Sequence, residues 1–360
     1  MKAAVLNQIP GELEIEEITI DKPGPREVLI RTAHAGLCHS DLHFLTGDWE
    51  MAPPLLMGHE AAGVVEEVGT DVDYVKAGDH VITCLSGFCG TCRYCTNGQL
   101  SICANRFALQ QRATPSLTNA DGVAVTPFTG LGAFAEQMLV HEHFVAKIRD
   151  DMPLDKASLI GCGVTTGLGA VFRTAKVEPG SSVCVIGAGG IGMSAIQGAR
   201  IAGAGKIIAV DLHDSKLEQA QALGATHVVN AGDGDPVAAV MEISGGGVDY
   251  SFEAIGLKIT AEQSFAVLGP GGTATVIGMI PLDQKVEIPG YELFLLEKKL
   301  QGSMMGSNQF RTDMPRYIDL YLDGRLKLDE MVSQHISLEQ VNDGFDAMRQ
   351  GESMRTVIDY

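Results

Sequence analysis

The pattern of apolar and polar positions divides the chain into two kinds of region. In the first 150 residues, short runs of alternating or β-branched residues are separated by Gly, Pro and Asp, and they predict strands at 27–30, 63–68 and 80–83. From about Pro179, apolar β-branched runs alternate with Ala-rich helical stretches, and the expected strands are 183–186, 206–210, 227–230, 249–253 and 273–277. After Lys299 the pattern is mixed, with a helix expected over 338–349 and a strand from Arg355. The chain is therefore predicted to be α/β, with a β-rich region and a parallel sheet covered by helices.

Length and charge narrow the functional class. A chain of 360 residues exceeds the size of one hydrophobic core, so two domains are expected. The 45 acidic and 26 basic residues give a net charge of −19, which argues against nucleic acid and anionic membranes as partners. Pro10, Gly11 and Glu12 come too early for the apolar core of a signal peptide, so a cytoplasmic protein is expected. The uncharged run 179–199 contains glycines and turn residues, which favour strand, loop and helix over a membrane span.

Half of the eight cysteines lie in one short segment, at Cys89, Cys92, Cys95 and Cys103. Four thiols this close can surround one tetrahedral Zn²⁺ and leave no position for substrate. A disulfide-paired loop or free thiols are the alternatives, but this spacing in a cytosolic chain favours metal. The segment 89–103 is therefore predicted to be a structural zinc lobe, and the chemistry is expected elsewhere.

A glycine-rich turn follows the expected strand 183–186 and precedes a helix over 193–202. This context is typical of a dinucleotide fingerprint, in which Gly187 allows a tight turn, Gly189 lets backbone amides approach a pyrophosphate, and Gly192 allows close packing of helix and strand. The motif also contains Gly190 and Ile191. Asp211 ends the next strand, where a carboxylate accepts hydrogen bonds from a ribose and repels a 2′-phosphate, so NAD is favoured over NADP. Lys216 is expected on the ribose side.

Three further residues, Cys38, His59 and Cys162, lie in segments rich in Gly, His and Cys. Each alone has an ordinary explanation as a small core residue or a hydrogen-bonded histidine. Together they offer two thiolates and one imidazole, which are three ligands of a tetrahedral ion with the fourth position open. The combination predicts a catalytic zinc.

With these motifs in this order, the chain resembles the zinc-containing alcohol dehydrogenases of the medium-chain dehydrogenase/reductase family over essentially its whole length. The resemblance implies a GroES-like catalytic domain over 1–163, a Rossmann NAD-binding domain over 164–304, and a return to the catalytic domain over 305–360. It also implies two zinc ions per subunit, one at Cys38, His59 and Cys162 and one at the four clustered cysteines. A homodimer or homotetramer is expected, because the strand candidate 300–305 resembles the edge at which family members join.

The resemblance also assigns roles to residues around the catalytic metal. Glu60 matches the acidic residue beside the metal, and Asp41 resembles the carboxylate that orients the histidine ligand. Ser40 and His43 match the hydroxyl and imidazole of a proton relay. These four residues are the expected catalytic group.

Cofactor and substrate contacts follow from the same resemblance. His39 lies where many members place an arginine against the pyrophosphate, Arg355 matches a second pyrophosphate contact, and Thr166 matches a residue that packs against the nicotinamide. The positions of the alcohol pocket correspond to Trp49, Leu85, Met279 and Met304. Their apolar character favours a hydrophobic primary or aromatic alcohol or aldehyde.

Several alternatives stay open at this point. Arg106 and Arg112 lie in a segment without a transferable pattern, and they would suit an anionic thiol adduct of the hydroxymethylglutathione type. A tightly held cofactor recycled by an external acceptor is also compatible with the motifs. A non-enzymatic zinc and NAD redox-sensing module would have little need for an open metal position beside a relay. A zinc-free reductase of this fold would lack both cysteine sets, which are present here.

Overall fold

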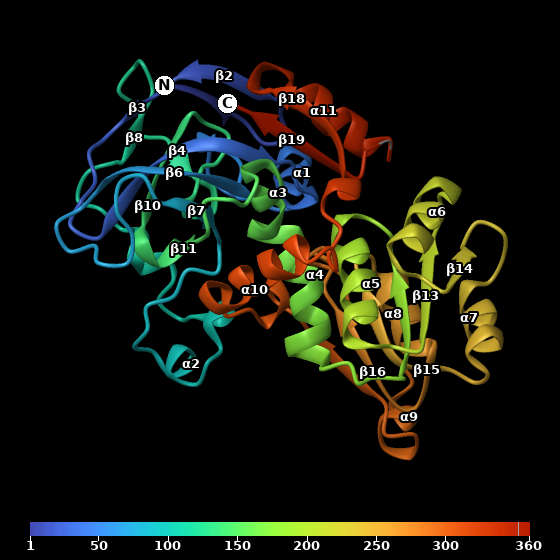
Figure 1. The fold of residues 1–360 in the computed structure, drawn as a ribbon. Helices are drawn as coiled ribbons and strands as arrows, with labels where there is room; N and C mark the ends of the chain where they lie inside the picture. The colour runs from blue at the N-terminus through green and yellow to red at the C-terminus, as the bar shows by residue number, and fades with distance from the viewer. Residues whose placement is uncertain (352) are drawn as a thin grey trace. The chain divides into compact units, whose positions relative to one another are not determined.

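The chain forms two compact units in the computed structural model, which describes residues 1–351 and 353–360 (Figure 1). The first unit comprises Met1–Cys162, Gln309–Gly324 and Leu328–Tyr360, and the second comprises Gly163–Asn308 and Arg325–Lys327. The sequence placed the boundaries at 163/164 and 304/305; in the structure the second unit begins at Gly163, extends to Asn308 and also includes Arg325–Lys327. Whether the units act as a catalytic and a cofactor domain stays a prediction.

The largest sheet of the first unit has the strand order β11-β7-β6-β4-β19-β18, and β10 pairs with β4. Its strands are β4 (Glu27–Gly36), β6 (Ala61–Val68), β7 (His80–Thr83), β10 (Gln137–His141), β11 (Val145–Lys147), β18 (Val332–Ser337) and β19 (Arg355–Asp359). All its neighbouring pairs are antiparallel except β18 and β19, which are parallel. The strands expected at 27–30, 63–68 and 80–83 lie in this sheet.

Shorter strands and helices complete the first unit. A second sheet has the order β2-β1-β5-β9, and β3 pairs with β8. These strands are β1 (Lys2–Leu6), β2 (Leu13–Glu17), β3 (Thr19–Ile20), β5 (Leu55–Leu56), β8 (Leu117–Thr118) and β9 (Thr126–Pro127). The helices are α1 (His39–Thr46), α2 (Arg93–Thr96), α3 (Leu154–Leu159), α10 (Phe310–Leu322) and α11 (Val341–Arg349). The helix expected over 338–349 is α11 preceded by a 3₁₀ turn at Leu338–Gln340.

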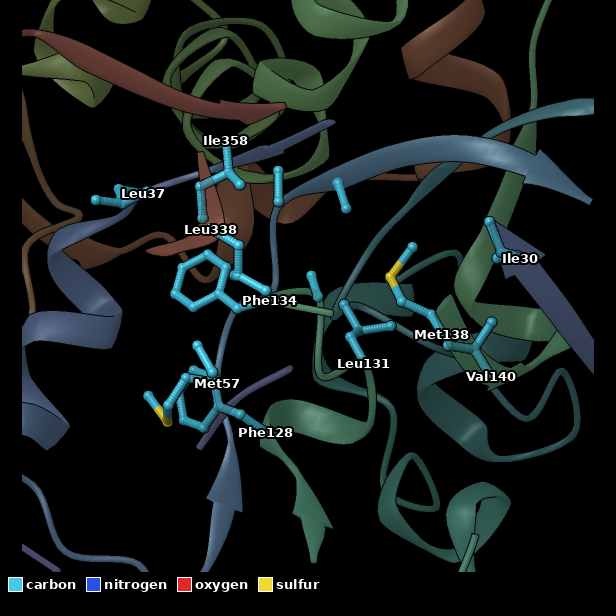
Figure 2. Packing of buried hydrophobic residues seen from close by; sticks show 14 of the residues in the cluster. Ile30, Leu37, Met57, Phe128, Leu131, Phe134, Met138, Val140, Leu338 and Ile358 are labelled. Atoms are coloured by element: carbon cyan, nitrogen blue, oxygen red, sulfur yellow. The ribbon is translucent and has the colours of Figure 1, made fainter. Parts of the chain in front are cut away.

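The core of the first unit is an apolar cluster to which most of its strands contribute side chains. Figure 2 shows Phe128 and Phe134 near Met57, with Leu338 and Ile358 above them. Because residues close in space here come from both ends of the chain, the last segment is needed to complete this core.

The second unit contains a parallel sheet with the order β14-β13-β12-β15-β16-β17. Its strands are β12 (Ser182–Ile186), β13 (Lys206–Asp211), β14 (His227–Asn230), β15 (Val248–Glu253), β16 (Leu268–Val276) and β17 (Lys299–Gly302). In order along the chain this is 3-2-1-4-5-6, the order of a Rossmann sheet. The strand expected at 300–305 is shorter than predicted, because the chain leaves β17 after Gly302 and forms a 3₁₀ turn at Met305–Ser307.

Helices connect the strands of this sheet. The connecting helices are α5 (Gly190–Ala202), α6 (Asp214–Leu223), α7 (Pro236–Ser244), α8 (Lys258–Ala266) and α9 (Gly290–Leu295), and α4 (Thr165–Gly169) precedes the first strand. The uncharged run 179–199 forms β12, a turn and most of α5. Among the described residues, no helix is both long and apolar enough to cross a membrane.

Candidate metal centres and cofactor site

The four clustered cysteines lie within bonding distance of one common point. The Sγ–Sγ distances are 3.5 Å for Cys92 and Cys95, 3.9 Å for Cys92 and Cys103, and 3.9 Å for Cys89 and Cys95. A tetrahedron with Zn–S bonds of about 2.3 Å has edges of about 3.8 Å, whereas a disulfide needs about 2.05 Å between sulfurs. The disulfide alternative is therefore wrong for this segment, and the four sulfurs fit a zinc ion.

Backbone donors favour thiolates in this lobe. The Cys92 N–H lies 3.3 Å from Cys89 Sγ, and the Cys89 N–H lies 3.3 Å from Cys103 Sγ. Slight burial opposes ionisation of Cys89, but hydrogen bonds from Thr91 and Cys92 lower its pKa to about 5. A short local segment thus provides both the sulfurs and the donors that stabilise their charge.

The second cluster brings together three residues that are far apart in the sequence. Cys38 precedes the first turn of α1, His59 follows the short strand β5, and Cys162 lies in a π-helical turn at Ile160–Val164. One ligand atom from each lies within 4.8 Å of the others, and all three side chains are buried. A hydrogen bond from Cys162 lowers the pKa of Cys38 well below its usual value, and the same contact raises the pKa of Cys162 well above its own.

Asp41 orients the imidazole of His59. Asp41 Oδ1 lies 3.1 Å from His59 Nδ1 and accepts a hydrogen bond from the Gly58 N–H at 3.2 Å. Burial opposes protonation of His59, but the Asp41 carboxylate raises its pKa to about 10. In the part of the chain that the structure describes, the buried Nε2 of His59 has no hydrogen-bond partner. A buried nitrogen without a partner next to two thiols is what a soft metal ion would satisfy.

Glu60 and Arg355 form a buried ion pair beside these residues. Arg355 Nη2 contacts Glu60 Oε1, and both side chains are almost fully excluded from solvent. Gly36 makes this pairing possible, because an added Cβ would collide with Glu60 Oε1 and lie 3.2 Å from Arg355 Nη2. The guanidinium of Arg355, which the resemblance assigned to a pyrophosphate, is engaged with a carboxylate of its own unit.

Helix α1 carries the other expected catalytic side chains. His43 is partly exposed, and its Nδ1 lies 3.3 Å from Asp48 Oδ2, which also accepts a hydrogen bond from Thr46 Oγ1 at 2.7 Å. Ser40 is half-buried on the same helix, and His39 is exposed at its first position. The helix therefore begins next to the buried Cys38 and carries both Ser40 and His43, whose role in a proton relay stays a prediction.

The glycine-rich turn has the geometry that its sequence suggests. Gly187 has φ +97°, which favours glycine, and an added Cβ at Gly192 would collide with the Gly187 carbonyl oxygen. Nothing lies within 4 Å of a Cβ added at Gly189, which caps α5, so this side of the turn is open. An open turn before a 13-residue helix has the geometry expected of a dinucleotide fingerprint, and its binding role stays a prediction.

Asp211 stands at the end of β13 beside this turn. Its Oδ2 accepts a hydrogen bond from the Ala188 N–H at 2.7 Å, and its Oδ1 accepts from the Leu212 N–H at 2.8 Å. The carboxylate is thereby oriented next to the glycine turn, while Lys216 is half-buried in the first turns of α6. Thr166 is buried in α4, where its Oγ1 contacts Met305 Sδ at 3.3 Å.

The expected pocket residues are divided between the two units. Trp49 and Leu85 lie in the first unit, and Leu85 packs against the core cluster. Met279 and Met304 lie in the second unit, where both retain exposed surface. Their shared role stays a prediction.

The two arginines considered for an anionic substrate are occupied. Arg112 donates to Asp21 Oδ2 and Glu27 Oε2, each at 2.6 Å. Arg106 lies over the ring of Phe107, with Nη1 3.5 Å from the Ser101 carbonyl oxygen. Arg112 is therefore engaged in two ion pairs, whereas Arg106 has no ion pair among the described residues.

Three residues that contact the expected site residues were not identified from the sequence. Asp48 is the partner of His43, Gly36 makes room for the Glu60–Arg355 pair, and the Phe128 ring stands edge-on to His59 with centroids 5.7 Å apart. A carboxylate five residues after His43 was the one signal available in the sequence. The other two depend on contacts between residues that are far apart in the sequence.

Comparison with known proteins places this arrangement in a family. Residues 24–150 match the "Alcohol dehydrogenase GroES-like domain", and residues 190–323 match the "Zinc-binding dehydrogenase" family. The chain is 39% identical to an NDMA-dependent alcohol dehydrogenase of Amycolatopsis methanolica, over 99% of this chain and 98% of the relative. It is 37% identical to an S-(hydroxymethyl)glutathione dehydrogenase of Paracoccus denitrificans, over 100% and 99% of the two chains.

A solved structure gives the same result. Benzyl alcohol dehydrogenase from Acinetobacter calcoaceticus superposes with a TM-score of 0.93 at 32% identity, covering 99% of this chain and 98% of that one. The matches extend over both units and over nearly the full length of each relative. The chain therefore belongs to the zinc-containing alcohol dehydrogenases of the medium-chain dehydrogenase/reductase family.

Proposed function

We propose that this protein is an NAD-dependent dehydrogenase that interconverts a hydrophobic primary or aromatic alcohol and its aldehyde, with two zinc ions per subunit. The observation that carries the proposal is the buried, unpartnered Nε2 of His59 beside Cys38 and Cys162. Three donors leave a tetrahedral ion one open position for substrate. The four sulfurs of the lobe close their ion completely, which suits a structural role.

Zinc bound at the open site would acidify the substrate hydroxyl, and a bound nicotinamide would accept the hydride. The protein's own part is to hold the donors. Asp41 accepts from His59 Nδ1 and so keeps the Nε2 lone pair directed toward the site. The Glu60–Arg355 pair places a neutralised carboxylate at the same site without adding a net charge.

The hydroxyl proton needs a route to solvent. We assign it to Ser40, the cofactor ribose and His43, as in the relay that the family resemblance implies. Asp48 accepts from His43 Nδ1, which leaves Nε2 of the partly exposed ring to take up and release the proton. His43→Ala should slow turnover and be partly rescued by external buffer. Unaltered turnover of His43→Ala between about pH 6 and 9 would remove this residue from the relay.

The cofactor assignment rests on the glycine turn and Asp211. The open turn at Gly189 admits a pyrophosphate, and the oriented Asp211 carboxylate would accept from a ribose 2′-hydroxyl and repel a 2′-phosphate. His39 provides less charge than an arginine at its position, so His39→Arg should slow NADH release. Equal NADH dissociation rates for the two proteins would contradict this role.

Two observations bear on the substrate. The benzyl alcohol dehydrogenase shares the fold over the whole chain, which supports an aromatic alcohol. The relative that acts on S-(hydroxymethyl)glutathione supports a thiol-adduct substrate as the second candidate. Because Arg112 is already paired with Asp21 and Glu27, one of the two cations considered for such an adduct is engaged, and we favour the aromatic alcohol.

The similarity to an NDMA-dependent enzyme raises a question about cofactor exchange. If the cofactor stays bound through turnover, added NAD⁺ alone will support little activity and NDMA will be required. Assays with and without NDMA separate this possibility from free exchange.

We also propose self-association through the second unit. β17 pairs with β16 alone among the described strands, so it leaves one edge of the sheet unpaired. The neighbouring α9 exposes Phe294 and Leu295 by 77% and 64% of their surface. An unpaired edge beside exposed large apolar residues favours a two-fold contact, as a dimer or within a tetramer.

The test is NADH formation by the zinc-loaded protein with benzyl alcohol, aliphatic alcohols and S-(hydroxymethyl)glutathione. Each substrate is run with NAD⁺, with NADP⁺, and with and without NDMA. Activity with benzyl alcohol and NAD⁺ that is absent in Cys38→Ser supports the proposal. Preference for NADP⁺ would contradict the proposed role of Asp211. Inactivity with every alcohol would contradict the proposal that the protein is an alcohol dehydrogenase.

A further inference from the structure

A third group of metal-ligating side chains lies on the main sheet of the first unit. His34 on β4, Asp359 on β19 and His335 on β18 come from three neighbouring strands. One ligand atom from each lies within 4.8 Å of the others. None of the three belongs to the zinc-ligand sets or to the cofactor turn.

The register of the sheet explains this convergence. His34 is the direct cross-strand partner of Asp359, and His335 pairs with Val357, two positions before Asp359. Side chains two positions apart share a face of a strand, so all three point to the same side. Ala35 and Ile358, on the opposite side, pack into the core cluster, which leaves the three polar side chains on the outer face.

The carboxylate of Asp359 already draws the two rings together. Its Oδ1 lies 2.9 Å from His34 Nδ1 and 2.8 Å from His335 Nδ1. Cis ligands at a divalent transition ion with bonds of about 2.0–2.2 Å lie about 2.9–3.4 Å apart. An ion could therefore replace the shared hydrogen bonds if it draws together the two imidazole nitrogens, which lie within 4.8 Å of each other.

The surroundings suit a cation that enters from solvent. The side chains of His34, His335 and Asp359 are 27%, 38% and 47% exposed, so water can complete the coordination. Asp155 Oδ2, from α3, lies 3.7 Å from His335 Nε2 and adds negative charge nearby. Lys156 Nζ lies 2.6 Å from the same oxygen and offsets part of this charge. The protein's net charge of −19 further favours cations over anions at its surface.

We propose that His34, His335 and Asp359 form a third metal site, which binds a divalent transition ion such as Zn²⁺ and ties β19 to both of its neighbouring strands. Two imidazoles and one carboxylate without thiolate favour Zn²⁺, Ni²⁺ or Cu²⁺ over Mg²⁺ or Ca²⁺. Because β19 begins with Arg355, an ion at its other end would stabilise the strand that carries the partner of Glu60.

The experiment titrates Zn²⁺ into the full-length protein whose cysteine sites are already zinc-loaded, with calorimetry and metal analysis as readouts. The wild type should bind one additional ion per chain. His335→Gln and Asp359→Asn should each weaken this binding by at least about tenfold, since even residues that only support a ligand typically contribute 10- to 100-fold. His227→Gln removes an exposed histidine from β14 and serves as the matched control.

Stability offers a second readout that does not depend on activity. Excess Zn²⁺ should raise the unfolding temperature of the wild type and of His227→Gln, because an ion that binds only the folded state stabilises it. The increase should be lost in His335→Gln and in Asp359→Asn. Two variants are used so that the test still holds if one of them fails to fold. Circular dichroism checks that each variant is folded.

The outcomes are distinct. Equal Zn²⁺ binding by the wild type and by both folded variants would overturn the proposal, as would the absence of an additional ion in the wild type. Cobalt added in place of zinc gives a further check, because a site of nitrogen and oxygen ligands lacks the thiolate-to-metal absorption of the cysteine sites. Strong new thiolate absorption on titration would place the ion at cysteines and would also count against the proposal.

Discussion

The four-cysteine lobe and the buried centre at Cys38 use the same sulfur chemistry in opposite surroundings. The lobe draws its ligands from fifteen consecutive residues, 89–103, and two of them, Cys89 and Cys92, keep exposed surface. The centre draws its ligands from three separate elements, and none of them is more than 3% exposed. The lobe is a local structure with backbone donors, whereas the centre is assembled by the fold.

Two other buried thiols show that burial alone does not make a ligand. Burial raises the pKa of Cys84 and of Cys184 to about 12, and hydrogen bonds from Ser86 lower that of Cys84 only in part. Cys38 is equally buried, but its hydrogen bond with Cys162 and the nearby His59 lower its pKa. Among equally buried thiols, donors and charges decide which one ionises most easily, and at the buried centre this is Cys38, because its hydrogen bond with Cys162 raises the pKa of Cys162.

The largest effect is expected from breaking the buried centre. Cys38→Ser should lose one of the two zinc ions and lower kcat/KM by more than about 10³-fold, because the Lewis acid is worth several kcal/mol. Zinc content and initial rates measure this. Cys184→Ala, which removes a buried thiol from β12, should keep both ions and the activity. Full activity in Cys38→Ser would contradict the proposal that this cluster, and not the four-cysteine lobe, holds the catalytic zinc.

Breaking the lobe should affect stability more than chemistry. Cys103→Ser removes one of four sulfurs, and we expect the free energy of unfolding to fall by about 3 kcal/mol, since structural zinc contributes directly to folding. Denaturant melts with zinc analysis measure this. The protein that remains folded should keep a kcat within a few-fold of the wild type. A selective loss of kcat with unchanged stability would contradict a structural role.

Asp41→Asn tests the orientation of the histidine ligand without removing a ligand. The amide cannot replace the charge opposite His59 Nδ1, so zinc affinity at this centre should fall by about 10- to 100-fold. Competition with a chelator measures the affinity of each ion separately. The lobe should release its zinc at the wild-type rate in this variant, and equal weakening of both sites would point to a general loss of structure.

The smallest effect is expected from the pH dependence of stability at His141, whose neighbour His143 contacts the residue before the four-cysteine lobe. His143 Nδ1 lies 2.6 Å from the carbonyl oxygen of Phe88, the residue before Cys89, and the His143 N–H donates to His141 Nδ1. Burial, with the charges of His143, Arg26 and Arg311, lowers the pKa of His141 to about 4. The folded protein therefore keeps His141 neutral.

The sign of the pH dependence follows from this pKa. As pH falls from about 6.5 to about 4, the unfolded chain binds a proton at His141 that the folded chain does not, so stability should fall by about 2–3 kcal/mol. Urea melts at several pH values measure this, and His141→Gln should flatten the dependence. A variant with an unchanged pH profile would contradict the assignment.

The sequence predicted much of the fold because its signals are local. The strand expected at 227–230 appears with the same bounds as β14, and the glycine turn lies between β12 and α5. The expected strand 273–277 starts earlier in the structure, at Leu268, because Leu268 pairs with Val248 and the ladder with β15 resumes at Thr273 after a register shift. Similarly, the strand expected at 300–305 ends at Gly302, because the chain then forms the 3₁₀ turn at Met305–Ser307.

By itself, the sequence determined the four-cysteine lobe, the dinucleotide turn and the family, since each depends on residues within one short segment or on motifs in a definite order. Only the tertiary structure decided that Arg355 pairs with Glu60, that Arg112 is engaged with Asp21 and Glu27, and that His34, His335 and Asp359 meet. These contacts join residues up to hundreds of positions apart. They depend on strand register and burial, which a one-dimensional pattern does not encode.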